Sequence, residues 1–454
     1  MDWLRRRFRP SPAAPAPEVP QAAQRLRAAR AALHAGDGRE ALRHIDLGIA
    51  ADPAYVPLYK LVTTTYALLP TGQDEWKLYA AAAERPNEAQ PFLELGRHFI
   101  AQSSQRIAVP LLERARALAP NDVAVARALA EALLGECRPR DARECLQSVD
   151  PAALEADPEA RTVLARARLL CGETEGILDE AQGETRDQLA EALERRATVA
   201  APDESARSLR AWHFIQYGAA LLHVSAAEGG RYDFVSLGEE DLARLVTRLQ
   251  RLLETLERPP EVVIALPDTD SVRVAEIVSR QTGVPLEGLP SSMVNRSTRQ
   301  MMEDVERERV LLARTHSLVV AADNRKLEAY PAYQHALPGQ TAFALTHYWL
   351  GGASLTPDVS GLLCRAAVFP WTTVQKPVAP PSPVSRVSAP DPPPRELKAR
   401  KVDPPAPAGV PEDDAAFEEA LAFYQERREL LKGGAQGQRR PFRRESPIQS
   451  TYAS

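Results

Sequence analysis

The chain has 454 residues, of which 44% are hydrophobic and 26% charged, so it is long enough for two or three domains with hydrophobic cores. A net charge of −5 gives no chain-wide reason to expect a nucleic acid as partner, and no apolar run approaches the roughly 20 residues of a membrane-spanning helix. The four cysteines form no CxxC pair and show no zinc-ligand spacing, which suits buried thiols in a reducing compartment.

From these features we expect a cytoplasmic protein with no cofactor and no metal. Arginine far outnumbers lysine, which we interpret as genome composition and as an indication of a bacterial source. Residues 1–20 are basic and rich in proline but contain no apolar core of a secretory signal. We predict a disordered leader there, with contact of Trp3, Leu4 and Phe8 with an anionic membrane surface as the alternative.

A repeated pattern occupies residues 21–200. The segments "AGDGREALRHIDLGIAADP" and "AQSSQRIAVPLLERARALAP" superpose with an offset of 67 residues, about two units of 34. A middle unit ends at Pro86, a fourth begins near Val123, and helical stretches at 157–171 and 174–198 extend or cap the stack. The positions that define the repeat are Ala41, Pro53, Phe92, Leu95, Gly96, Phe99, Ala108, Ala115, Pro120 and Ala142.

Residues 22–155 resemble the tetratricopeptide repeat (TPR) family. The copy from Ala89 has the family's order of large and small residues, and small residues at Gly96 and Ala108 let two antiparallel helices approach closely. The first copy departs from the pattern at Arg25, and the fourth lacks the terminal proline. The resemblance implies an all-α solenoid in which the first helix of each unit lines a concave groove.

The resemblance also implies which residues face that groove. Carried over by register, they are Arg30, Lys60, Thr64, Arg97, Arg127 and Glu131. Four of these six are cationic, which suits a protein or peptide partner with acidic side chains or a C-terminal carboxylate. The alternative is that arginine is simply the commonest polar residue of this chain, and the asparagines typical of the family's peptide clamp are missing here.

A different pattern begins near Arg210, and we predict a small α/β domain with a mainly parallel sheet over residues 205–374. "ALLHVSA" and "YDFVSLG" flank a glycine-containing turn and indicate two joined strands. A leucine-rich helix over 239–257 follows, and then the strand that runs up to Leu266. A helix from Val272 to a stop at Gly283, a strand near 283–289, a charged helix over 296–313 and a strand at "HSLVVAAD" complete the pattern.

The loop "LPDTDS" raises the question of a ligand site. Residues 210–372 are similar in element order to the phosphoribosyltransferase-type Rossmann-like fold, which implies a pyrophosphate loop here and an acidic phosphate motif at Asp323. The second motif departs from that family, since Lys326, Leu327 and Glu328 stand where glycine and threonine belong. The candidate ligand residues are Asp268, Asp270, Ser271 and Asp323.

A helix cap is the alternative explanation of that loop. Asp270 or Ser271 is a suitable N-cap, and Asp268 favours the turn after Pro267, whereas carboxylates repel an anionic ligand unless Mg²⁺ intervenes. The histidines His316, His335 and His347 fit packed positions better than catalytic ones. A helix ending at Gly351 and Gly352 explains that pair, Cys364 fits a buried thiol, and no GxSxG nucleophile motif occurs; we therefore predict no catalytic residue.

The tail begins after Trp371. Residues 375–411 contain twelve prolines and predict an extended linker, whereas 412–432 predict a short amphipathic helix that docks on a partner or folds back. The basic residues 433–454 predict a disordered end. The whole pattern predicts a multidomain, non-catalytic TPR adaptor or scaffold with an accessory α/β domain. The alternative is a phosphoribosyltransferase-like enzyme, or a sensor of a nucleotide or phosphate ligand, that uses the α/β domain.

Overall fold

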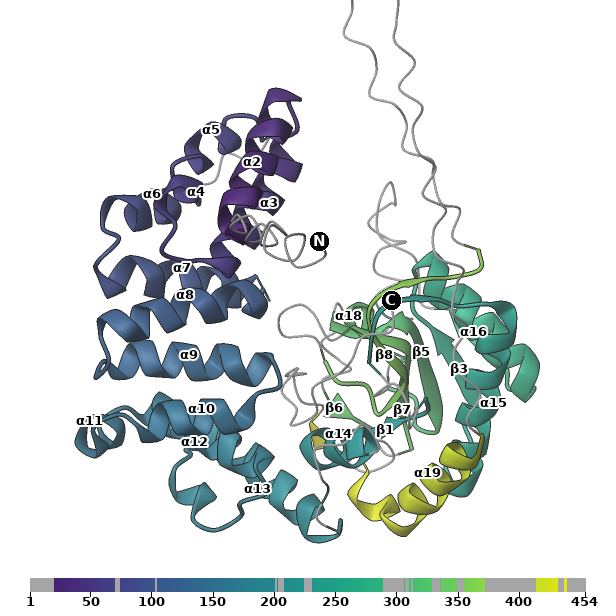
Figure 1. The fold of residues 1–454 in the computed structure, drawn as a ribbon. Helices are drawn as coiled ribbons and strands as arrows, with labels where there is room; N and C mark the ends of the chain where they lie inside the picture. Colours follow the sequence, from purple (N-terminus) through teal and green to yellow (C-terminus); the bar gives the residue numbers. More distant parts are fainter. Residues whose placement is uncertain are drawn as a thin grey trace, which may run out of the picture. The chain divides into compact units, whose positions relative to one another are not determined.

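The computed structural model describes residues 20–69, 74–102, 104–200, 202, 208–223, 231–288, 306, 310–311, 313–328, 335–337, 339–348, 355–371, 414–431 and 437–438. These residues form two compact units, one up to Glu194 and one from Arg195 on (Figure 1). The predictions for the leader up to residue 19, the proline-rich linker, most of the charged helix at 296–313 and the basic end concern residues outside this description.

The first unit is entirely helical, as the repeat pattern predicts. Its helices are α2 (Gln21–His34), α3 (Gly38–Ala51), α4 (Val56–Tyr59), α5 (Val62–Tyr66), α6 (Trp76–Glu84), α7 (Ala89–Ala101), α8 (Gln105–Leu118), α9 (Val123–Gly135), α10 (Pro139–Gln147), α11 (Pro151–Glu155), α12 (Pro158–Leu170) and α13 (Gly183–Ala197). Aspartates begin several of them: Asp37, Asp122 and Asp157 each accept a hydrogen bond from a backbone N–H of the first turn.

Helices α7 and α8 form the most regular pair and show why the repeat needs small residues. Gly96 on α7 faces Leu112 on α8, and a Cβ atom at Gly96 would lie 2.6 Å from the Leu112 side chain. Ala108 and Ala115 on α8 are fully buried, as are Ala41 on α3 and Ala142 on α10 at equivalent positions. Phe92, Leu95 and Phe99 are also buried, between this pair and its neighbours.

The second pair is irregular. The repeat register places Lys60 and Thr64 on one first helix, but the chain forms two short helices here, and Lys60 lies just after α4 while Thr64 lies on α5. The β-branched residues along α5 have low helix propensity, whereas Pro57 lies in the first turn of α4, where proline is tolerated. In the same region α3 packs directly against α8. Tyr59 and Tyr79 fill the space beside α7, through edge contacts with Phe92 and Phe99.

The end of the helical unit also differs from the prediction. The stretch 174–198 is not one helix, because Gly176 and Gly183 adopt positive φ angles that a continuous helix does not contain. A 3₁₀ turn at Ile177–Asp179 precedes α13, which begins only at Gly183.

The second unit is built on a seven-stranded sheet in which every pairing is parallel. The strand order is β1-β8-β7-β5-β3-β4. Strand β2 also pairs with β8, but with residues of β8 that follow those paired with β1. The strands are β1 (Ala220–Leu221), β2 (Arg231–Ser236), β3 (Val262–Ala265), β4 (Leu286–Gly288), β5 (Ser317–Asp323), β7 (Thr341–Tyr348) and β8 (Val359–Val368). A separate antiparallel pair joins β6 (His335–Ala336) to β9 (Gly437–Gln438).

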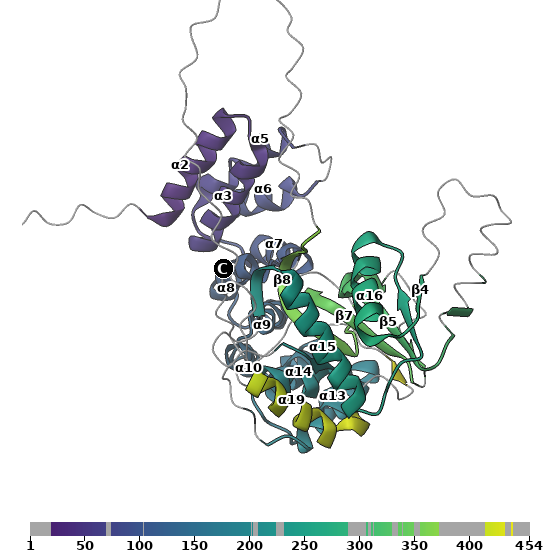
Figure 2. The same cartoon turned by 90° about the vertical axis from the view of Figure 1, so that its right-hand side faces the viewer.

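Helices cover both faces of this sheet, as a parallel sheet requires. Helices α15 (Glu239–Thr255) and α16 (Thr269–Thr282) lie on one face, and α18 (Asn324–Glu328) lies on the other (Figures 1 and 2). Helix α14 (Leu209–Tyr217) packs against β1. The predicted strands at 262–266 and 317–323 are fully buried, and Gly283 ends α16 with a positive φ angle, as predicted.

Two predictions for this unit are wrong. β1 and β2 do not pair with each other as strands joined by a turn, because each pairs in parallel with β8, which is more than 120 residues away in the sequence. Residues 341–348 form the buried strand β7 and not a helix that ends at Gly351 and Gly352. These eight residues lie in the middle of the sheet, where neighbouring strands decide the backbone conformation.

The predicted amphipathic helix of the tail forms α19 (Asp414–Glu426), followed by a 3₁₀ turn at Arg428–Leu430. It folds back on its own chain and packs against α15 (Figures 1 and 2). The sequence leaves open whether this helix docks on a partner or folds back on its own chain, and in the structure it folds back.

The close approach at Gly96 predicts a large cost for added volume. Gly96→Val should lower the free energy of unfolding of the helical unit by about 1–3 kcal/mol, because Leu112 is fully buried and has little room to move. Urea unfolding followed by circular dichroism measures this change. Ala101→Val, at the exposed end of the same helix, is the matched control and should change stability little. Equal stability of the two variants would contradict the packing described.

A carboxyl group on α3, next to the irregular pair, predicts a pH dependence. Asp46 on α3 accepts a hydrogen bond from the Tyr79 hydroxyl (3.0 Å), and Tyr66 donates one to the nearby Glu75 (2.8 Å). Burial raises the pKa of Asp46 to about 7, with a further increase from the Glu75 charge and a decrease from the Tyr79 hydrogen bond.

The folded chain therefore holds the proton of Asp46 more tightly than the unfolded chain, in which the pKa of an aspartate is about 3.9. The contribution of Asp46 to stability should be greatest below about pH 4 and should fall as the pH rises to about 7. Asp46→Asn keeps an acceptor for Tyr79 and should remove this slope, with a gain at about pH 8 of at most ~4 kcal/mol. Urea unfolding across this pH range tests the prediction, and an unchanged slope in Asp46→Asn would contradict it.

Candidate functional site

The first candidate site is the surface formed by the first helices of the repeats, here called the first-helix surface. Its predicted residues lie on or next to α2, α4, α5, α7 and α9. These helices pack in succession: α2 contacts α4, Tyr59 of α4 meets Phe92 of α7, and α7 contacts α9. The structure therefore places the predicted residues along one continuous stack of helices.

The side chains of this surface divide into two groups. Arg30, Lys60, Thr64 and Arg97 are exposed, and among the residues described the three cations have no ion-pair partner. Guanidinium and ammonium groups that are exposed and unpaired are available to a carboxylate of another molecule.

Arg127 and Glu131 belong to the second group, because both are partly buried on α9. The Arg127 guanidinium lies 3.3 Å from Asp157 and also pairs with Glu159 at the start of α12. Asp157 is itself the N-cap of α12. Arg127 therefore links two successive first helices, which is a structural role that the repeat register does not reveal.

The second candidate site is the carboxyl edge of the sheet, where β3, β5 and β8 end. Asp268 is the N-cap of α16 and accepts a hydrogen bond from the Ser271 backbone N–H (3.1 Å). The helix starts at Thr269, so the expectation that Asp270 or Ser271 is the N-cap is wrong. The Ser271 hydroxyl is fully buried and accepts a hydrogen bond from the Ala322 backbone N–H (2.9 Å), which ties α16 to β5.

Asp270 has a partner that the sequence does not indicate. The indole N–H of Trp371 donates a hydrogen bond to its carboxylate (2.7 Å), although the two residues are 101 positions apart. The Trp371 ring also stacks on Phe369, with ring centres 5.3 Å apart and planes 8° from parallel. The hydrogen bond connects the segment after β8 to the start of α16, and the stacking orders the two rings within that segment.

Asp323 is buried at the end of β5 and pairs with Arg325, whose guanidinium nitrogen lies 3.0 Å from the carboxylate. The Arg325 guanidinium also lies 3.9 Å from the centre of the Tyr348 ring. The hydrogen bond to Asp323 raises the pKa of Arg325, and burial raises the pKa of the Cys364 thiol to about 12. All four side chains of the predicted ligand loop are thus bonded within the protein.

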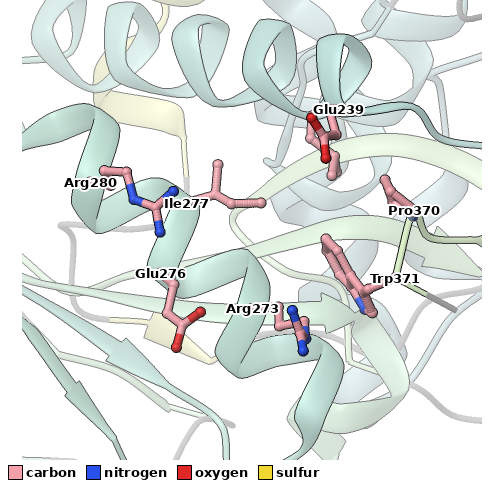
Figure 3. Close-up of a pocket in the computed structure, with 8 residues that line it drawn as sticks. Glu239, Arg273, Glu276, Ile277, Arg280, Pro370 and Trp371 are labelled. Atoms are coloured by element: carbon pink, nitrogen blue, oxygen red, sulfur yellow. The ribbon is translucent and has the colours of Figure 1, made fainter.

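A groove of about 510 Å³ lies beside α16, near this edge of the sheet (Figure 3). Arg273 and Arg280 from α16 border it, Glu239 from the start of α15 lies across from them, and Trp371 lies at one end (Figure 3). The sequence does not single out any of these residues. Arg273, Glu276 and Arg280 occur three and four positions apart, which indicates only an exposed helix face.

Of the three histidines named from the sequence, His347 is packed as expected, whereas His316 is exposed, so the expectation of a packed position is wrong for His316. His347 is fully buried on β7, and its Nδ1 lies 2.9 Å from the Ser360 hydroxyl oxygen. His316 adopts a positive φ angle (53°) in the turn before β5. In the described parts of the chain, no three His, Cys, Asp or Glu side chains are grouped so that they could hold a metal ion.

The described helices include none that is both long and apolar enough to span a membrane. No disulfide joins Cys137, Cys145, Cys171 and Cys364, all of which lie in the described part of the chain.

Comparisons with known proteins address the helical unit. Solved structures similar to this chain include MamA from Desulfovibrio magneticus, with 19% identity, coverage of 39% of this chain and 98% of that chain, and a TM-score of 0.22. PilW, a type IV pilus biogenesis factor, has 17% identity, coverage of 44% and 86%, and a TM-score of 0.20. A variant O-GlcNAc transferase of Thermobaculum terrenum has 13% identity, coverage of 72% and 50%, and a TM-score of 0.20.

No curated protein sequence matches the chain. At such low identities and TM-scores, the three structures do not carry an assignment by themselves. A tetratricopeptide repeat family model matches residues 108–167, from within α8 to within α12. Residues 108–167 of the helical unit therefore match the tetratricopeptide repeat family, which residues 22–155 resemble in sequence.

Proposed function

We propose that the chain is a non-catalytic adaptor or scaffold that binds a protein partner on the first-helix surface of its tetratricopeptide repeats. The observation that carries this proposal is the group of exposed cations Arg30, Lys60 and Arg97, which have no ion-pair partner in the described chain. By contrast, neighbouring arginines such as Arg127, Arg143 and Arg168 are engaged in ion pairs within the repeats.

The chemistry of these side chains favours an acidic partner. Arginine forms bidentate hydrogen bonds with carboxylates, and an extended peptide with acidic side chains or a free C-terminal carboxylate offers such groups at several points. Because the cations are exposed, salt should screen their attraction for the partner. Four cysteines that form no disulfide with one another support our proposal that the protein acts in the cytoplasm.

The alternative function, a phosphoribosyltransferase-like enzyme or a sensor of a nucleotide or phosphate ligand, would use Asp268, Asp270, Ser271 and Asp323. Each of these side chains has a hydrogen-bond or ion-pair partner in the protein, and the family match does not extend to the α/β unit. No observation in the described residues favours this alternative over the adaptor.

The adaptor proposal predicts that binding depends on the charges of the first helices. A chain with Arg30→Glu and Arg97→Glu should bind acidic peptides with a free C-terminal carboxylate at least about tenfold more weakly than the original chain, since both attractions become repulsions. Fluorescence anisotropy with the full chain measures the affinities. Peptides with an amidated C-terminus separate the contribution of the terminal carboxylate from that of the acidic side chains.

The matched control reverses two exposed arginines on second helices, Arg39→Glu on α3 and Arg106→Glu on α8. It changes the net charge equally and should leave the affinity nearly unchanged. Equal losses in the two double variants, or no loss in either, would contradict binding at the first-helix surface.

A further inference from the structure

Helix α19 binds to its own chain in the manner of a helix ligand in a groove. Its buried residues are Phe417, Ala420, Leu421 and Tyr424, at relative positions 0, 3, 4 and 7. This spacing places them on one face of a helix, and it is the spacing with which amphipathic helices anchor in the grooves of partner proteins. The surface that α19 contacts therefore has the features of a binding site for an amphipathic helix.

Arginines of α14 and α15 form much of the surface that receives α19. Arg248 is 3% exposed, and its guanidinium lies 5.0 Å from the centre of the Phe417 ring and 3.1 Å from the Asp414 carboxylate. Arg251 forms two hydrogen bonds with the Glu418 carboxylate (2.6 and 2.9 Å). The surface thus combines positive charge with room for an aromatic ring, and both features match α19.

Further contacts hold the middle and the end of the helix. Phe423 meets Phe214 of α14 edge to face, with ring centres 5.4 Å apart, and the Arg210 guanidinium lies 5.1 Å from the centre of the Phe423 ring. After α19, Arg428 pairs with Glu257 at 3.0 Å.

Tyr424 connects α19 to the backbone of the sheet. Its hydroxyl is buried and accepts a hydrogen bond from the Leu221 backbone N–H (2.8 Å). Leu221 belongs to the short strand β1, whose other edge pairs with β8. The tyrosine hydroxyl therefore satisfies a backbone donor of an edge strand, and such donors are otherwise open to pairing with another chain.

The interface has the character of a reversible contact. The Asp414 side chain is 83% exposed, and the Arg251 and Glu418 side chains are 44% and 56% exposed, so water reaches much of the ionic part. The 42 residues from 372 to 413 connect Trp371 to α19. A segment of this length can extend to about 140 Å, so the covalent connection does not require α19 to stay in place.

We propose that the α14–α15 surface is a receptor site for an acidic, aromatic, amphipathic helix, and that α19 is its tethered occupant. The partner in trans is a protein segment of the same chemistry: an acidic residue in the first turn, an aromatic residue three positions later and a tyrosine seven positions after that. Such a segment binds by displacing α19. This site is separate from the first-helix surface and does not depend on the function proposed for it.

The covalent connection of α19 through residues 372–413 sets the affinity that such a partner needs in order to displace it. A connected ligand has a local concentration on the order of 1 mM, so a free helix of equal affinity at micromolar concentration displaces little of it. Cutting the connection removes this advantage. Binding of a free helix should therefore depend strongly on whether the segment 372–413 is intact.

The experiment uses the full chain with a specific protease site inserted between residues 390 and 391. A fluorescent peptide of residues 412–440, which includes α19 and β9, serves as the probe, and fluorescence anisotropy measures its binding before and after cleavage. We expect an apparent affinity at least about tenfold higher for the cut chain than for the uncut chain. Circular dichroism establishes that the cut chain remains folded.

Charge exchange supplies the matched control. Arg251→Glu in the chain should weaken binding of the original peptide, and Glu418→Arg in the peptide should restore it, because the ion pair is then reversed and not lost. A peptide with Phe417→Ala and Tyr424→Ala should not bind. A cut, folded chain that does not take up the peptide would overturn the proposal and make α19 a permanent part of the fold. Equal binding to the original and the Arg251→Glu chain would place the peptide elsewhere and also overturn it.

Discussion

The helical unit depends on how closely two antiparallel helices can approach each other. At Gly96 the approach leaves no room for a Cβ atom beside Leu112, and Ala41, Ala108 and Ala142 take buried positions on the second helices. Close pairs bury their large residues, Phe92, Leu95 and Phe99, against neighbouring pairs. The polar positions of the first helices then remain at the surface, and this is where Arg30 and Arg97 lie. The proposed binding surface is thus a consequence of the packing behind it.

The α/β unit has a different requirement. A parallel sheet needs cover on both faces, and its short edge strand β1 needs partners for its backbone groups. Helices α15, α16 and α18 cover the faces, but β1 donates its outer hydrogen bond, from the Leu221 backbone N–H, to the hydroxyl of Tyr424, more than 200 residues away (Figure 1). The tail therefore both completes the unit and occupies a surface that suits a helix of another protein. Protection of an edge and regulation of a binding site are compatible roles for one segment.

Local signals in the sequence were sufficient for some elements and not for others. The repeat spacing, the strand at 262–265 and the stop at Gly283 depend on neighbouring residues and agree with the structure. The pairing of β1 and β2 with β8, the strand β7 and the bond between Trp371 and Asp270 depend on contacts between distant residues, so no local pattern contains them. The threonines of α5 are a local signal of low helix propensity next to the break between α4 and α5, which the repeat register obscured. Of the candidate site, the register identifies the exposed Arg30 and Arg97, but it cannot distinguish them from Arg127, which is paired with another helix.

The central claim is that a protein partner binds along the first helices of the repeats. Amide hydrogen exchange of the full chain, with and without a saturating acidic peptide that ends in a free carboxylate, tests this claim most directly. The account predicts slower exchange in α2, α5 and α7, with little change in the second helices α3 and α8. Protection confined to the α/β unit, or protection of the second helices alone, would contradict it.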